Sequence, residues 1–433
     1  MTQQGQIKGL NRRKFLKVGG VSTLALTLGT TDLFSLDSSE VFAEETGKIG
    51  KGKGVGANAI VVGHRGSPLL APEETLASYK KAMEEKVEVL EGDVQLTKDG
   101  EMILLHDDTL IRTTNVKEIF PDRSPWRPGD LTLAEIKQLN AGSWFDSRFA
   151  GEKIPTVQEV LALLDKNTGV TFELKSPQNS PGVATKLAQA LVDAGLADGG
   201  TLHSGAYRMM VHSRDEAALK EFHQVAPNVQ LLFLTGGDML ADSELDRLAS
   251  WTVGVFSHPR KTSKSDIERA HARGLKVYCD PVDSPEQIEM ALCQGYDYLV
   301  TNQPTTALRV RSQKDINLRK SGVVIDHVFP NPSGDDIQPE TGEHVTLRNI
   351  TDETINVSNH YLRDQASSLL RIGDGVEIEP GSLLRVYPGP GTNRPGHYYN
   401  GLAAGFLNNT NGDTLTYYSE DHTIQDIFSY IVP

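Results

Sequence analysis

The chain of 433 residues is poor in cysteine and has no surplus of positive charge. Its two cysteines, Cys279 and Cys293, are too few for a disulfide framework or a structural zinc site, and we expect both to be buried thiols. The 43 Lys and Arg residues are outnumbered by 57 Asp and Glu residues, and the net charge of −14 argues against nucleic acid as a partner. No Gly-x-Gly-x-x-Gly motif follows the first apolar run, which argues against a dinucleotide-binding fold.

Composition and length are typical of a soluble globular protein with more than one domain. Hydrophobic residues make up 38% and charged residues 23% of the chain, enough apolar material for a full core. A chain of this length exceeds one ordinary domain, and we expect a barrel followed by a smaller β domain.

The N-terminal residues predict export from the cytoplasm. Arg12 and Arg13 precede an uncharged run at residues 18–31, and residues 41–43 supply small side chains for signal peptidase. This pattern resembles a twin-arginine export signal, which implies cleavage near Ala43 and a periplasmic or extracellular protein. A membrane anchor is the alternative, but the run is shorter than the ~20 residues that span a bilayer. Residues 44–57 read as a flexible lead-in.

Strand-like and helix-like stretches alternate over residues 58–312. Eight apolar runs predict strands, at residues 59–63, 87–95, 170–175, 209–213, 229–235, 252–257, 275–279 and 298–301. Amphipathic segments lie between them, and eight such repeats predict a (β/α)₈ TIM barrel of the α/β class. Residues 107–153 are long for one connection and contain a helix signal at 131–139 that follows Asp130, so we expect a small insertion there.

The pattern changes after a polar linker at residues 313–321. From residue 322 to residue 433 helical periodicity disappears, and short β-like runs alternate with turn signals such as Asn411-Gly412-Asp413. This predicts an all-β, immunoglobulin-like sandwich as the second domain.

Polar residues that suit phosphodiester chemistry stand at the ends of the predicted barrel strands, where barrel enzymes build their sites. They comprise two histidines, three carboxylates, an arginine and a lysine: His64, His106, Glu91, Asp93, Glu173, Arg65 and Lys175. Oxygen ligands suit a hard divalent cation, Ca²⁺ or Mg²⁺, and cations neutralise a phosphodiester while histidines move protons. His212 and His258 also stand near predicted strand ends and are the other histidines expected near the mouth.

Residues 59–310 resemble the glycerophosphodiester phosphodiesterase family. The resemblance rests on Gly63-His64-Arg65-Gly66, Pro72-Glu73-Glu74-Thr75, Glu91-Gly92-Asp93, Thr97-Lys98-Asp99-Gly100, His106-Asp107, Arg112-Thr113-Thr114 and Glu173-Leu174-Lys175. It implies a (β/α)₈ barrel with a small insertion and one bound divalent metal. The implied reaction is hydrolysis of a glycerophosphodiester, such as glycerophosphocholine or glycerophosphoethanolamine, to glycerol 3-phosphate and an alcohol.

The resemblance also implies roles for individual residues. It makes His64 and His106 the acid/base pair, Glu91, Asp93 and Glu173 the metal ligands, Arg65 and Lys175 the phosphate-binding cations, and Glu73 a support of the metal shell. Which histidine is the acid stays open, as does the nucleophile, water or a glycerol hydroxyl. The chain departs from the family at Asp280, where a tryptophan normally packs on the substrate, and at Asp283, where asparagine is common. An acidic group there favours a polar or cationic leaving alcohol.

The C-terminal residues resemble a lamin-tail β-sandwich, through residues 323–328, 343–349 and 406–414. Such a module implies either binding to a cell-surface component or stabilisation of the barrel.

Two alternatives to the main interpretation remain. One is a barrel phosphodiesterase that acts on lysophospholipids or sphingomyelin, like the barrel phospholipases D. The other is a surface-binding protein with a vestigial barrel.

Overall fold

The computed structural model describes residues 58–312, 322–365, 368–409 and 412–430. The predicted export signal, the lead-in and the linker at residues 313–321 lie outside the described residues. Within the described residues, no helix is both long and apolar enough to cross a membrane.

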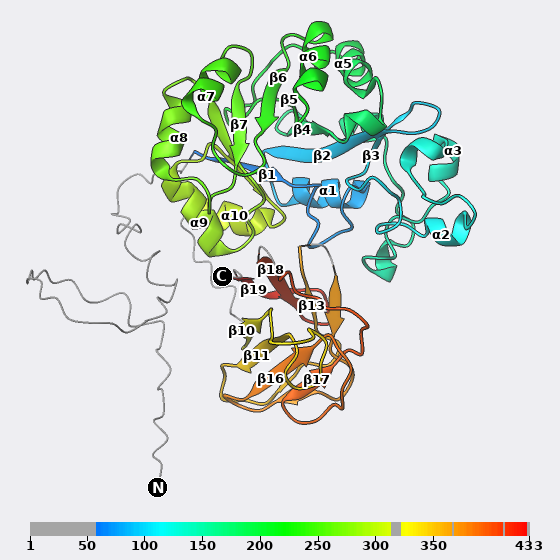
Figure 1. The fold of residues 1–433 in the computed structure, drawn as a ribbon, viewed down its shortest axis with the longest axis vertical. Helices are drawn as coiled ribbons and strands as arrows, with labels where there is room; N and C mark the ends of the chain where they lie inside the picture. Colours follow the sequence, from blue (N-terminus) through cyan, green and yellow to red (C-terminus); the bar gives the residue numbers. More distant parts are fainter. Residues whose placement is uncertain (1–57, 313–321, 366–367, 410–411, 431–433) are drawn as a thin grey trace, which may run out of the picture. The chain divides into compact units, whose positions relative to one another are not determined.

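Eight parallel strands close into a barrel, which confirms the predicted fold (Figure 1). The first strand pairs with both the second and the last, and each of the others pairs with its neighbours in chain order. The strands are β1 (Ile60–Gly63), β2 (Val89–Leu96), β4 (Gly169–Leu174), β5 (Met209–Ser213), β6 (Gln230–Leu234), β7 (Gly254–Ser257), β8 (Lys276–Cys279) and β9 (Tyr298–Thr301). A further short strand, β3 (Met102–Leu104), pairs antiparallel with β2.

Helices cover the outside of the strands (Figure 1). They are α1 (Leu76–Glu84), α4 (Val157–Leu161), α5 (Val183–Asp193), α6 (Glu216–Val225), α7 (Asp242–Ala249), α8 (Lys264–His271), α9 (Pro285–Gln294) and α10 (Pro304–Arg311). Local sequence explains their ends: Ser284 and Gln287 form a capping box at the start of α9, and Gly295 ends it with φ 98°. Helix α7 was not predicted from the sequence, because half of its residues are charged and it buries only Leu245 and Leu248.

Apolar side chains pack on both faces of the barrel wall. Inside, the ring of Tyr278 stacks on Tyr298 and lies tilted against Phe256, and Met210 and Val62 belong to the same cluster. Outside, the strands pack against the helices, and this explains why the strands are apolar runs without polar alternation. Cys279 is buried here, but Cys293 is exposed and the expectation of a buried thiol was wrong, because it points away from the buried face of α9.

The predicted insertion folds around a small core of its own, formed by Leu110, Val116, Leu131, Ile136 and Leu139 with their neighbours. Its elements are α2 (Val116–Ile119), η2 (Pro128–Asp130), α3 (Leu133–Ile136) and η3 (Ser147–Phe149). The helix predicted at residues 131–139 is shorter than expected. It begins after Thr132, which forms a capping box with Glu135, and not after Asp130.

The C-terminal residues form two four-stranded sheets with a common apolar core, which confirms the β-sandwich. One sheet has the order β10 (Val323–Phe329), β11 (His344–Asn349), β16 (Leu383–Tyr387) and β17 (His397–Tyr399). The other has the order β14 (Leu369–Arg371), β13 (Tyr361–Arg363), β18 (Asp413–Tyr418) and β19 (Ile424–Tyr430). A separate pair joins β12 (Ile355–Asn356) and β15 (Glu377–Ile378). Strands β13, β14 and β17 were not predicted, because three residues are too few to show an alternating pattern.

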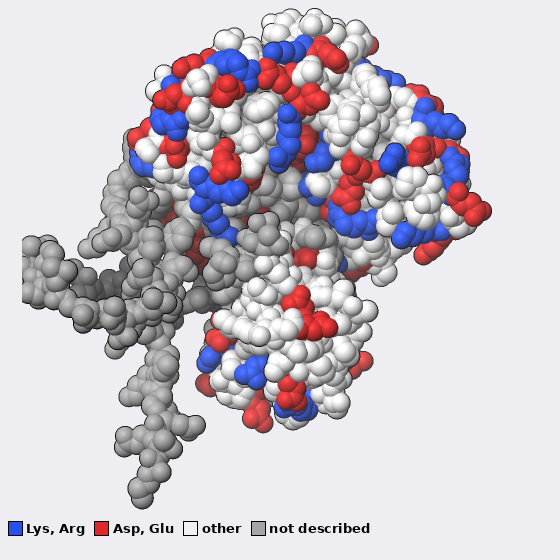
Figure 2. All heavy atoms as spheres, viewed as in Figure 1, with Lys and Arg blue, Asp and Glu red and all other residues white. Residues whose placement is uncertain are grey.

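On the face drawn in Figure 2, acidic and basic side chains are intermixed over the barrel.

Candidate active site

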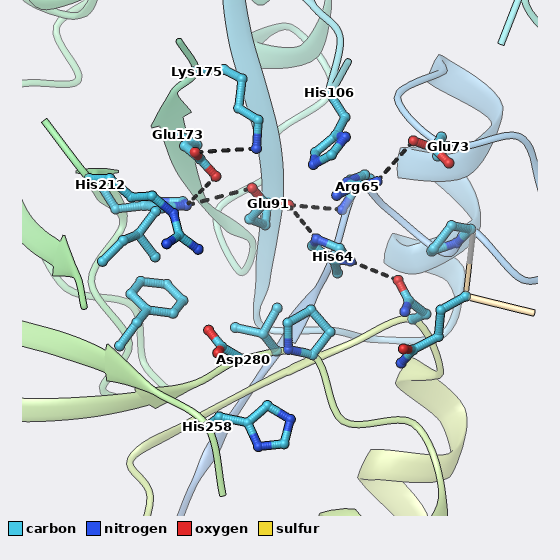
Figure 3. Close-up of a pocket in the computed structure, with 18 of the residues that line it drawn as sticks. His64, Arg65, Glu73, Glu91, His106, Glu173, Lys175, His212, His258 and Asp280 are labelled. Atoms are coloured by element: carbon cyan, nitrogen blue, oxygen red, sulfur yellow. Dashed lines mark hydrogen bonds and ion pairs between the residues drawn. The ribbon is translucent and has the colours of Figure 1, made fainter. Parts of the chain in front are cut away.

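A pocket of about 400 Å³ lies where the barrel strands end. Seven of the eight predicted site residues line it: His64, Arg65, Glu73, Glu91, His106, Glu173 and Lys175. The eighth, Asp93, is 1% exposed and lies just behind them. Figure 3 shows the labelled side chains converging on one space from several strands. The structure therefore brings residues that are far apart in the sequence together at one pocket.

The turn after β1 places the first two of these residues. Arg65 has φ 51° and Gly66 has φ 93°, a left-handed conformation that reverses the chain and that glycine adopts readily. A Cβ at Gly66 would lie 2.4 Å from the Ser78 hydroxyl, so the turn packs directly on α1. The backbone N–H of Arg65 donates to Glu91 Oε2 at 3.0 Å and ties the turn to β2.

His64 is oriented by an amide side chain from the end of β9. Its Nδ1 lies 2.8 Å from Asn302 Oδ1, while the amide nitrogen of Asn302 donates to Asp283 Oδ2 at 2.8 Å. Because that donation fixes which way the amide faces, Nδ1 of His64 carries the proton and donates it to Asn302. The Nε2 atom is thus the acceptor, 4.0 Å from Glu91 Oε2. Burial, followed by the charge of Arg65, lowers the pKa of His64 to about 3, so it is neutral at pH 7.

His106 is oriented by a carboxylate. Its Nδ1 donates to Asp107 Oδ1 at 2.8 Å, and Arg112 binds both oxygens of Asp107, at 2.8 and 2.9 Å. Arg112 also binds both oxygens of Glu73, each at 2.8 Å. Glu73 accepts from Arg65 as well, at 3.0 Å. The Glu73 carboxylate therefore bridges Arg65 and Arg112. Glu73 was predicted to support the metal shell, and in the structure it contacts these two arginines.

Adjacent strands bring three possible metal ligands together. Glu91 on β2, Glu173 on β4 and His212 on β5 offer ligand atoms that all lie within 4.8 Å of one another. His212 Nε2 lies 3.7 Å from Glu91 Oε1 and 4.0 Å from Glu173 Oε2. Asp93 was predicted as the third ligand, and its carboxylate instead contacts Arg65 at 3.3 Å and Lys175 at 3.4 Å.

The charges in this cluster fit a cation. Burial and the neighbouring Asp93 raise the pKa of Glu91 well above its usual range and that of Glu173 to about 7. Burial alone would raise the pKa of Asp93 too, but Lys175 and Arg65 hold it well below its usual range. The carboxylates of Glu91 and Glu173 therefore lie in surroundings that disfavour their negative charge, and a bound divalent cation would compensate for this. Burial lowers the pKa of His212 to about 3, so its imidazole is neutral, as a metal ligand must be.

The pocket has a second end with a different character. Asp280 follows β8 and His258 follows β7, and Figure 3 shows both on the side away from Lys175 and His106. Burial raises the pKa of Asp280 and lowers that of His258. Phe256, Leu234 and Val300 supply apolar wall to the same pocket. One end therefore suits an anionic phosphate, and the other offers an acidic and an aromatic side chain.

Sequence reasoning missed several members of this site. It placed His212 and His258 near the mouth, which is correct, but gave His212 no part in metal binding. It gave no role to Arg112, Asn302 or Arg214, although Arg214 follows β5 directly and lines the pocket. A position just after a barrel strand was the available signal for Arg214 and Asn302.

Comparison with known proteins agrees with this geometry. A model described as the glycerophosphoryl diester phosphodiesterase family matches residues 64–306, and a lamin tail domain model matches residues 318–431. The chain is 31% identical over 263 residues to a glycerophosphodiester phosphodiesterase of Bacillus subtilis, a match that covers 58% of this chain and 86% of that protein. A glycerophosphodiester phosphodiesterase of Caldanaerobacter subterraneus is 31% identical over 254 residues, with 58% of this chain and 97% of that protein covered.

Among solved structures, the barrel shares its fold with an Oleispira antarctica phosphodiesterase that was determined in complex with the product sn-glycerol-3-phosphate. The TM-score is 0.51 at 24% identity, and the match covers 58% of this chain and 96% of that one. The family model spans more than half of the chain and includes every residue of the pocket named above. The chain therefore belongs to the glycerophosphoryl diester phosphodiesterase family of enzymes, with a lamin tail domain after its barrel.

Proposed function

We propose that the chain hydrolyses glycerophosphodiesters with a cationic alcohol, such as glycerophosphocholine or glycerophosphoethanolamine, to glycerol 3-phosphate and the free alcohol. The observation that carries the proposal is the pair of oriented histidines. His64 and His106 each have Nδ1 occupied by a hydrogen bond, and both line one pocket with Arg65 and Lys175. This arrangement leaves one Nε2 on each histidine for proton transfer to or from a substrate.

The hydrogen-bond partners of the two histidines differ, and this difference suggests which histidine is the base and which is the acid. His64 rests on the neutral amide of Asn302 and is unprotonated at pH 7, so it suits the base that takes the proton of the attacking oxygen, from water or from a glycerol hydroxyl whose cyclic phosphate product water then opens. His106 rests on the carboxylate of Asp107, which stabilises an imidazolium, so it suits the acid. As the new P–O bond forms, the bond to the leaving alcohol breaks, and His106 protonates that oxygen. Arg65 and Lys175 bind the phosphoryl oxygens and stabilise their charge.

We propose Ca²⁺ or Mg²⁺ as the cofactor. Glu91, Glu173 and His212 would hold it, since their ligand atoms lie within 4.8 Å of one another, and Asp93 would be a further carboxylate donor in place of its contact with Lys175. When bound, the cation supplies positive charge that lowers the energy of the phosphoryl group during displacement. The acidic Asp280 at the other end of the pocket supports a cationic head group, and Phe256 lines the same pocket.

The test is release of glycerol 3-phosphate by the purified chain without residues 1–43. We expect turnover of glycerophosphocholine and glycerophosphoethanolamine that EDTA abolishes and that added Ca²⁺ or Mg²⁺ restores. Lysophosphatidylcholine and sphingomyelin belong in the same panel, because Ile111 and Ile119 in the insertion are exposed and offer apolar contact to a lipid chain. Turnover of these lipids alone would favour the lipid phosphodiesterase alternative, and no turnover at all would contradict the proposal.

The site of action is proposed from the N-terminal sequence. Arg12 and Arg13 support export by the twin-arginine route, with cleavage near Ala43. Cell fractionation and N-terminal sequencing of the exported protein test this. We expect the paired substitution Arg12→Lys with Arg13→Lys to retain the protein in the cytoplasm, whereas Lys8→Arg, outside the pair, leaves export unchanged.

A further inference from the structure

One residue of the pocket does not come from the barrel. Gln365 lines the pocket beside His64 and Asn302, and it lies in the segment between β13 and β14 of the lamin tail domain. The 18 other lining residues belong to residues 64–302. The domain for which the sequence predicts only surface binding or stabilisation therefore reaches the site itself.

Gln365 contacts the carboxylate that organises the end of β9. Its Nε2 donates to Asp283 Oδ2 at 3.0 Å. Asp283 is 1% exposed, and its oxygens also accept from the backbone N–H of Asn302 at 2.7 Å and from the Asn302 side chain at 2.8 Å. The Thr301 hydroxyl donates to the same carboxylate at 3.2 Å. Four donors thus fix this buried charge, and one of them belongs to the second domain.

These contacts continue without a break to a proposed catalytic residue. Gln365 holds Asp283, Asp283 holds the amide of Asn302, and Asn302 holds Nδ1 of His64 at 2.8 Å. The direction in which the Asn302 amide faces decides which nitrogen of His64 keeps its proton. Two buried side chains therefore link Gln365 to His64, and no contact between Gln365 and His64 is needed for this link.

A second contact holds the loop that follows His64 and Arg65. The Tyr418 hydroxyl donates to the backbone oxygen of Leu69 at 2.7 Å, and Leu69, Tyr361 and Tyr418 form one buried apolar cluster. The rings of Tyr361 and Tyr418 stack at 4.7 Å. Leu69 itself lines the pocket, so the lamin tail domain shapes the wall on this side as well.

The barrel insertion is held in the same way. The guanidinium of Arg363 donates to the backbone oxygen of Phe145 and lies 4.2 Å from the centre of its ring. His422 lies 3.2 Å from Asp146, the next residue. Arg363 is 3% exposed, so its contact with Phe145 is buried.

We propose that the lamin tail domain is a working part of this active site and that Gln365 is a positioning residue, which acts on His64 through Asp283 and Asn302. This inference rests on the proposed function for its kinetic readout. Removing the Gln365 donor leaves the fold and the phosphate-binding groups in place but loosens the Asp283 carboxylate that orients the Asn302 amide. Turnover then falls while substrate affinity is kept.

The test uses full-chain variants. Gln365→Met keeps the length of the side chain without the donor, and Gln365→Glu places a second carboxylate against Asp283. We expect kcat to fall about tenfold in Gln365→Met, further in Gln365→Glu, with KM changed less than about twofold. Gln338→Met is the matched control, because Gln338 lies in the same domain and donates to Ser333 within its own loop.

A double-mutant cycle separates positioning from a general structural role. If Gln365 acts through Asn302, the pair Gln365→Met with Asn302→Ala loses little more than Asn302→Ala alone. If the two substitutions instead lower kcat by independent factors that multiply in the double variant, Gln365 does not act through Asn302. Unchanged kcat in both Gln365 variants also overturns it.

Hydrogen exchange gives a readout that does not depend on turnover. We expect faster exchange of the amides in residues 64–71 and 301–303 in Gln365→Glu and in Tyr418→Phe than in the wild type and in Gln338→Met. If the wild type turns over no substrate but these differences are present, the proposed function fails and the coupling between the domains stands. If exchange in both segments is unchanged, the coupling is refuted whatever the activity.

Discussion

His106 donates from Nδ1 to Oδ1 of Asp107 over 2.8 Å, and the two residues are adjacent in the chain. The other histidine of the pocket, His64, has an amide in the same place, that of Asn302. A carboxylate stabilises a charged imidazole more than a neutral amide does, and burial together with the charge of Arg65 keeps His64 neutral. This asymmetry is the basis on which we distinguish the acid from the base.

Asp107→Asn should therefore slow turnover strongly. The amide keeps the size of the side chain but no longer stabilises a protonated His106, and we expect kcat to fall about a hundredfold or more. Steady-state kinetics with glycerophosphocholine measure the effect. Asp108→Asn is the control, since Asp108 is the exposed neighbour, and similar rates for the two variants would contradict the role of Asp107.

Glu91→Gln should weaken binding of the divalent cation. Glu91 lies between His212 and the backbone of Arg65, and neutralising it removes a charged ligand from the centre of the cluster. We expect the affinity for Ca²⁺ or Mg²⁺, measured by calorimetry, to fall at least about tenfold. Glu101→Gln, at an exposed position with a weak contact to Lys186, should leave it unchanged. Equal affinity in wild type and Glu91→Gln would place the cation elsewhere.

Asp280→Asn should change the preference among alcohols. Loss of the negative charge removes an attraction to a cationic head group, and we expect kcat/KM for glycerophosphocholine to fall about tenfold, equivalent to ~1.4 kcal/mol. The value for glycerophosphoglycerol, whose alcohol is neutral, should stay within about twofold of wild type. Asp238→Asn, an exposed carboxylate 3.8 Å from Lys261, is the control. An equal fall in kcat/KM for both substrates in Asp280→Asn would mean that Asp280 does not select the alcohol by its charge.

Glu343 should make the stability of the lamin tail domain depend on pH. It is buried, its Oε1 accepts from the backbone N–H groups of Phe406 and Leu407, and burial raises its pKa to about 7. An acid whose pKa is higher in the folded state stabilises the fold when protonated. Its contribution is complete below the unfolded pKa of about 4.3 and is lost as the pH rises through about 7.

We therefore expect the wild type to lose stability relative to Glu343→Gln between pH 5 and pH 8, because the amide cannot ionise. Denaturant unfolding of both proteins at each pH measures the difference. Glu353→Gln, at an exposed position of the same domain, should follow the wild type. Parallel pH profiles for wild type and Glu343→Gln would show that Glu343 does not titrate in this range.

Much of the barrel could be read from the sequence, because closed parallel sheets are apolar on both faces and each strand appears as a continuous run. All eight predicted runs became strands of the barrel. The residues that were harder to predict are those in short elements. Three-residue strands such as β13 show no period, and α7 has only two buried leucines to reveal its inner face.

The sequence by itself determined which chemistry the first half of the barrel brings to one place. His64 and Arg65 follow β1, Glu91 lies within β2, and Glu173 and Lys175 stand at the end of β4. Barrel closure brings these strands side by side with their ends on the same side. Their chemical types follow from the chain, and so does the expectation of a cation beside a phosphate.

Only the tertiary structure decided which partners complete that site. Asn302 reaches His64 from the last strand of the barrel, His212 reaches Glu91 across β4, and Gln365 reaches Asp283 from another domain. No spacing in the sequence marks these pairs, since 238 residues separate His64 from Asn302 and 82 separate Asp283 from Gln365. Packing brings these side chains into contact, and this packing orients the histidines that we propose as the acid and the base.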